Sequence, residues 1–124
     1  WTHNGGVVDF LKCKGFVNGS KPLKELIGEE YVTPNYNNLK TQCSYKMAEK
    51  IVKREVGEVD HDSVVKERTS EEMEQIKQKD IDKDGKIQLV GKDIIKSMIG
   101  RSPDEWDSIM MRYWFELTPK AFTF

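Results

Sequence analysis

A long apolar stripe near the end of the chain limits how it can fold more than any other part of the sequence. Its members recur at intervals of three and four residues: Trp106, Ile109, Met110, Tyr113, Trp114 and Leu117. This spacing places side chains on one face of an α-helix. Ser102 and Pro103 precede the stripe with a capping hydroxyl and a fixed first turn, and Pro119 follows it. The sequence therefore predicts a core helix between the two prolines.

Helical spacing also dominates the rest of the chain. We expect further helices over residues 7–13, 22–27, 39–56, 70–79 and 91–99. The third has one apolar face, formed by Leu39, Cys43, Met47, Ile51 and Val52. Thr69 to Glu72 reads as a capping box at the start of the fourth, and residues 29–37 read as a loop. A chain of 124 residues fits one domain. The expected fold class is all-α, a compact bundle of about five to six helices spanning residues 1–124.

The segment from Asp80 to Gln88 has the spacing of a calcium-binding loop. Asp80, Asp82 and Asp84 offer carboxylates at alternate positions, and Gly85 allows a sharp turn after them. The main-chain carbonyl of Lys86 and the side chain of Gln88 can add two more oxygens. Calcium prefers six to eight oxygen ligands, so this pattern favours a calcium site.

These residues resemble the first nine positions of the EF-hand family, with Ile87 at its apolar eighth position. The resemblance covers about residues 70–100 and implies a helix–loop–helix around a bound Ca²⁺ ion. The family closes its site with a Glu at position twelve, whereas this chain has Gly91 there and Asp93 two residues later. We therefore expect the loop to be structural or to bind calcium weakly.

EF-hands usually occur in pairs, and the only candidate for a second hand is an acidic segment after the long helix. Glu58, Asp60 and Asp62 again occupy alternate positions, but no glycine follows them at the bend. The segment is either a vestigial hand or a solvated acidic turn, and we favour the turn.

Three features favour a secreted protein. Cys13 and Cys43 make an even pair, which we expect to form a disulfide in an oxidising compartment. Asn18-Gly19-Ser20 is an N-glycosylation acceptor pattern. The sequence starts at Trp1 rather than Met, as a cleaved signal peptide would leave it. The alternative is a pair of buried thiols in a cytosolic protein.

The charge and the absence of known motifs exclude several classes of function. The net charge of −1 gives no general attraction to nucleic acid, and no apolar run approaches the roughly 20 residues of a membrane span. No nucleophile elbow, zinc spacing or phosphate-binding loop is present, so we do not expect an enzyme. In size and composition the chain is similar to small secreted proteins of arthropod saliva or haemolymph. We expect a binding or effector protein that acts on a protein partner.

Two alternatives remain open. The surplus of Trp, Phe and Met side chains would also suit a carrier of a small apolar ligand, although a well-filled core is the favoured explanation. The acidic loop would also suit a calcium sensor of the EF-hand type, against which Gly91 argues.

Overall fold

The computed structural model describes residues 15–57, 62–80 and 85–117. Along the chain it contains β1 (Glu25–Ile27), β2 (Glu30–Val32), α2 (Leu39–Val52), α3 (Ser63–Glu74), β3 (Gln78–Lys79), β4 (Gln88–Leu89), α4 (Lys92–Ile99), α5 (Asp104–Arg112) and α6 (Trp114–Leu117). The strands form two separate two-stranded antiparallel sheets, β1–β2 and β3–β4. The predicted all-α bundle of five to six helices is therefore wrong, and so is the EF-hand-like helix–loop–helix within it.

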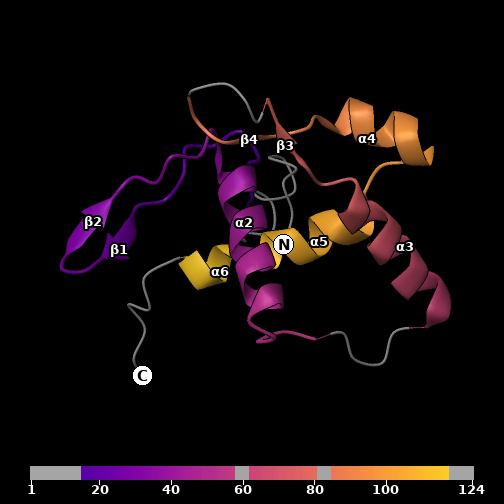
Figure 1. Cartoon of the computed structure of the whole chain (residues 1–124), viewed down its shortest axis with the longest axis horizontal. Coiled ribbons are helices and arrows are strands. Elements are labelled where there is room, and N and C mark those ends of the chain that lie inside the picture. Colours follow the sequence, from indigo (N-terminus) through magenta and orange to yellow (C-terminus); the bar gives the residue numbers. More distant parts are fainter. Residues whose placement is uncertain (1–14, 58–61, 81–84, 118–124) are drawn as a thin grey trace.

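The core lies where α2, α5 and α6 meet, and α5 also packs against α3 (Figure 1). Its buried side chains come from four parts of the sequence: Phe16, Leu39, Cys43, Met47, Trp106, Met110, Tyr113 and Leu117. Trp106 and Met110 have no exposed surface. The apolar stripe predicted near the end of the chain is thus confirmed as the main contributor to the core.

Helix α2 forms where the sequence predicts a helix, because its start is capped and its apolar residues share one face. Asn38 takes an extended conformation, and its Oδ1 accepts a hydrogen bond from the backbone N–H of Thr41 at 2.9 Å. Gln42 is buried on the same helix, and its side chain binds the backbone of Leu23, which lies earlier in the chain. Its side chain accepts from Leu23 N–H at 2.7 Å and donates to Leu23 C=O at 2.8 Å.

The segment predicted as a second helix, residues 22–27, is instead an irregular stretch followed by β1, the first strand of the hairpin β1–β2. Leu26 lies opposite Tyr31, and Ile27 lies opposite Glu30. Gly28 has a φ of 66° at the first of two loop positions, where two-residue hairpin loops favour glycine. Tyr31 and Val32, which follow the turn, are strand formers, and they pair back onto the first strand. Residues 30–32 are accordingly strand rather than loop.

Helix α3 starts seven residues earlier than the capping box predicts. The carboxylate of Asp62 caps it by accepting from Val65 N–H at 2.9 Å. Thr69 lies inside the helix, where its hydroxyl donates to Val65 C=O at 2.8 Å. The helix ends at Glu74, and residues up to Lys79 form a connection and strand β3 instead of its continuation.

The last helices follow the predicted pattern with one interruption. Helix α4 ends at Ile99 and is capped by Gly100, whose φ of 77° suits glycine. Helix α5 begins after Pro103, with three acids in its first turn, and Ser102 makes no side-chain cap there. At Tyr113 the backbone N–H bonds to Met110 C=O at 3.0 Å, and this tight turn separates α5 from α6. The predicted helix over 7–13 lies outside the described residues.

Candidate metal site

The acidic loop connects the strands of a hairpin. Strand β3 pairs with β4 in the register Gln78 to Leu89 and Lys79 to Gln88. The Tyr45 hydroxyl on α2 donates to Gln78 Oε1 at 3.1 Å and so ties the hairpin to the long helix. The pairing brings Lys79 beside Gln88, so the two ends of the loop that starts at Asp80 lie close together.

Both described ends of the loop have left-handed backbone. Asp80 has a φ of 52°, which Asp tolerates better than most residues, and Gly85 has a φ of 135°, which favours glycine. Gly85 thus has the backbone conformation that the predicted turn requires. Asp82 and Asp84 lie outside the described residues, so their role as ligands stays a prediction.

The far side of the loop is fixed by a segment fifty residues away in sequence. Ile87 N–H donates to Asn35 C=O at 2.9 Å, and Asn37 N–H donates to Ile87 C=O at 2.8 Å. These bonds form a parallel bridge between Tyr36 and Ile87. The Asn35 side chain adds a bond from Nδ2 to Gly85 C=O at 3.1 Å. Ile87, which the EF-hand resemblance makes the anchor, therefore pairs with residues 35–37.

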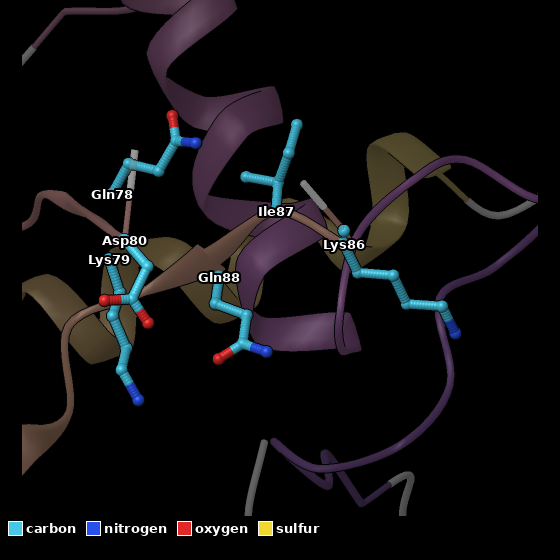
Figure 2. A pocket seen from close by; sticks show the side chains of 7 residues that line it. Gln78, Lys79, Asp80, Lys86, Ile87 and Gln88 are labelled. Atoms are coloured by element: carbon cyan, nitrogen blue, oxygen red, sulfur yellow. The ribbon is translucent and has the colours of Figure 1, made fainter. Parts of the chain in front are cut away.

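A polar pocket of about 180 Å³ lies at this end of the hairpin. It is lined by Gln78, Lys79, Asp80, Gly85, Lys86, Ile87 and Gln88. Figure 2 shows the Asp80 carboxylate and the Gln88 amide on one side of the hairpin, while the Ile87 side chain points to the other. A carboxylate, an amide oxygen and main-chain carbonyls are hard oxygen donors, which suit Ca²⁺. The residues present at this end of the loop therefore fit the ion.

The closing ligand of an EF-hand has no counterpart. Gly91 is the N-cap of α4, with φ −70° and ψ 156°, and offers no side chain. Asp93 lies in the first turn of α4, where its carboxylate meets the positive end of the helix dipole. Within the described ranges, no three His, Cys, Asp or Glu side chains gather as a metal-binding group.

Asp62, the last residue of the proposed second hand, is the helix cap of α3, which supports the reading of an acidic turn. Glu58 and Asp60 lie outside the described residues.

The structure describes only some of the residues in the disulfide and glycosylation predictions. Cys43 is a buried free thiol whose burial raises its pKa to about 12, and Cys13 lies outside the described residues, so the pairing stays a prediction. Asn18 is partly exposed in a turn closed by Ser20 N–H donating to Val17 C=O at 3.1 Å.

Sequence reasoning missed a buried carboxylate between α3 and α5. Glu72 has no exposed surface, and its Oε2 accepts from Trp106 N–H at 2.8 Å near the start of α5. Arg101 Nε lies 3.7 Å from Glu72 Oε1, and Arg101 Nη1 bonds Glu71 at 2.9 Å. Glu72 thus serves as a cap for α5 that comes from a different helix.

The pKa of Glu72 is raised to about 7, first because burial disfavours the charged form and then because Glu105 lies close. The Trp106 N–H and Arg101 act in the opposite direction. In the sequence Glu72 is one of several acids on a charged helix. Its contact with Trp106 joins α3 to α5, and no local sequence pattern indicates a contact between residues so far apart in the chain.

A second charged contact crosses the core near Trp106. Lys92 pairs with the buried carboxylate of Asp107, and Lys40 Nζ lies 5.3 Å from the Trp106 ring centroid. Burial lowers the pKa of Lys40, while Asp107 partly opposes this. The contacts join α2 and α4 to α5.

Comparison with protein-family models, curated proteins and solved structures gives no match for this chain. Among the described residues, no helix is both long enough and apolar enough to cross a membrane.

Proposed function

We propose that this chain is a secreted binding protein whose loop from Asp80 to Gln88 takes up Ca²⁺ weakly. The observation that carries the proposal is the spacing of oxygen donors on a hairpin loop fixed by the Tyr36–Ile87 bridge. A loop whose ends are already held loses less conformational entropy when it closes around an ion.

The absence of a closing Glu sets the expected affinity. With Gly91 at that position, the loop lacks two carboxylate oxygens, and Lys86 and Lys79 add positive charge at the pocket. We therefore place the dissociation constant near the ~10⁻⁴–10⁻³ M of extracellular modules. Such a site fills only outside the cell, in agreement with the secretion proposed from Cys13, Cys43 and Asn18.

Calcium should stabilise the fold because it binds the folded loop and not the unfolded chain. At ten times the dissociation constant, ligand linkage gives about 1.4 kcal/mol, equivalent to roughly 4–6 °C in melting temperature for a domain of this size. The measurement is a set of thermal melts in CaCl₂, in MgCl₂ and in chelator.

Asp80→Asn and Asp84→Asn should abolish the rise. Asp93→Asn is the matched control, because it makes the same change of charge on the exposed first turn of α4. Equal melting temperatures with calcium and with chelator would contradict the proposal, as would an equal rise in the Asp80→Asn protein.

A separate experiment tests the proposal that the protein is secreted. Protein secreted from eukaryotic cells should gain the mass of two hydrogens on reduction, because Cys13 and Cys43 pair, and closing this loop would stabilise the fold by ~3–4 kcal/mol. It should also carry a glycan that Asn18→Gln removes. Two free thiols and an unmodified Asn18 in that protein would contradict the disulfide and glycan predictions on which the secretion proposal rests, without affecting the calcium proposal.

We propose that the protein acts through contact with a protein partner rather than by catalysis. The large exposed apolar side chains of the β1–β2 hairpin support this, because such groups favour protein contacts.

A further inference from the structure

Lys53 and Arg54 form the only pair of adjacent basic residues in the sequence. They lie where α2 ends, and Figure 1 places this end at the lower margin of the molecule. Every residue from 51 to 57 is exposed, and after Arg54 the chain continues to Gly57 without helix or strand. Endoproteases cut exposed connections of this kind in preference to packed elements, because a bound peptide must enter the active site in an extended form.

The backbone at the end of α2 is strained. Arg54 has a φ of 56°, in the left-handed region that residues other than glycine seldom adopt. Arg54 N–H donates to Ile51 C=O at 3.0 Å, and Glu55 N–H donates to Lys50 C=O at 2.9 Å. These two bonds form a Schellman cap, whose left-handed position is usually glycine. Opening the cap relieves the strain at Arg54, so the last turn of α2 should unwind more readily than the rest of the helix.

The side chains of this last turn add little to its stability. Val52 is 81% exposed and Ile51 is 43% exposed, so unwinding the turn uncovers little further apolar surface. Two ion pairs cross the turn, each with an N–O distance of 2.7 Å: Lys50 with Glu55 and Lys53 with Glu49. Both pairs are open to water, where ion pairs contribute little. Local unfolding of this turn should therefore cost less than unfolding of the core.

We propose that the peptide bond between Arg54 and Glu55 is a site of limited proteolysis by a serine endoprotease that recognises paired basic residues. Lys53 and Arg54 occupy the two subsites before the scissile bond, where acidic groups of the protease bind cationic side chains. Hydrolysis adds one water molecule across the bond and leaves a carboxylate on Arg54 and an amino group on Glu55. In the organism this cleavage rests on the proposed secretion, because the chain must meet the protease outside the cytosol, whereas digestion with a purified enzyme does not depend on it.

The cleaved protein should keep its fold as two chains. The buried core takes side chains from both sides of the cut: Phe16, Leu39, Cys43 and Met47 before it, and Trp106, Met110, Tyr113 and Leu117 after it. Cys13 and Cys43 both lie before the cut, so their predicted disulfide cannot join the two chains. Noncovalent contacts alone therefore hold the chains together, and a denaturant should separate them without a reducing agent.

Digestion of the native protein with a purified endoprotease specific for paired basic residues tests the site. Mass spectrometry should identify residues 1–54 and 55–124 as the first products, and the two should migrate together in gel filtration until guanidinium chloride is added. Lys53→Gln and Arg54→Gln should each slow the cut at least about a hundredfold, because a subsite built for a cation rejects a neutral side chain. Lys96→Gln is the matched control, because it removes an exposed basic residue of α4 and should leave the rate unchanged.

A synthetic peptide with the sequence of residues 46–57 shows whether the enzyme accepts the sequence itself. If the peptide is cut and the native protein stays intact, the folded chain does not present the site and the proposal is overturned. First cleavage at another bond, or an unchanged rate in the Arg54→Gln protein, would overturn it too. Products that separate in gel filtration without denaturant would contradict the two-chain form. Circular dichroism spectra of the uncut variants should match that of the native protein, because the exchanged side chains are exposed.

Discussion

Trp106→Ala should lower the free energy of unfolding by about 3–5 kcal/mol, a large share of the stability of a typical domain. The Trp106 side chain is fully buried among residues of α2, α5 and α6, so its removal leaves a large cavity at the centre of the core. It also removes the aromatic face that Lys40 Nζ approaches. Urea unfolding followed by circular dichroism measures the change.

Phe115→Ala is the matched control for this experiment. Phe115 is an aromatic residue nine positions later, and 43% of its surface is exposed. Its replacement should cost less than about 1.5 kcal/mol. If the two variants lose similar stability, the core is not centred on Trp106 as described.

Glu72→Gln should make the protein more stable at pH 8 and leave its stability at pH 4 unchanged. The folded-state pKa of Glu72 is about 7, against an ordinary value of 4.5. Between these pH values the folded state holds a proton that the unfolded state has lost. The native protein therefore loses stability as the pH rises from about 4.5 to about 7, by on the order of 2–3 kcal/mol.

A glutamine at position 72 cannot ionise, but it keeps an oxygen that can accept from Trp106 N–H. The variant should therefore lack this fall in stability. Because the contact with Glu72 also lowers the pKa of Glu105, the difference between the two stability curves reports on this pair of carboxyl groups.

Glu71→Gln is the control, because Glu71 is adjacent and its side chain is 48% exposed. It should shift stability by less than about 1 kcal/mol at either pH. Parallel curves for the native and Glu72→Gln proteins would contradict the raised pKa. Glu72→Ala should destabilise the protein at every pH, because it removes the cap of α5.

The long apolar faces were predictable from the sequence because periodicity reports directly on burial. The face of α5 and the first part of the face of α2 fall at the expected positions, and the glycine end of α4 at Gly100 is confirmed. Ile51 and Val52, which the sequence places on the buried face of α2, are instead exposed at the end of the helix. Short segments were harder to predict. Leu23, Leu26 and Ile27 fit a helical spacing, yet Gly28 and the strand formers after it decide for a hairpin. Three residues are too few to distinguish the period of a helix, about 3.6 residues, from the period of a strand, about two residues.

The residue at which α3 starts could not be predicted from capping residues alone. Asp62 and Thr69 both make acceptable caps, and the earlier one prevails because it extends α3 alongside α5. Likewise, the bridge between Tyr36 and Ile87 joins two loops without any shared pattern. Only the packed structure brings residues 35–37 to the candidate metal site. The donor spacing from Asp80 to Gln88 was readable from the sequence, whereas the hairpin that carries it was not.

The hairpin loop from Asp80 to Gln88 should bind calcium, and a calcium titration of ¹⁵N-labelled protein followed by amide NMR spectra tests this. We predict saturable shifts centred on Gly85, Lys86, Ile87 and Gln88, with smaller shifts at Asn35 and Asn37, whose backbones bond to Ile87. All should fit one dissociation constant near ~10⁻⁴–10⁻³ M. Unchanged amide positions in the loop at ten millimolar calcium, or shifts spread over exposed acids elsewhere, would contradict it.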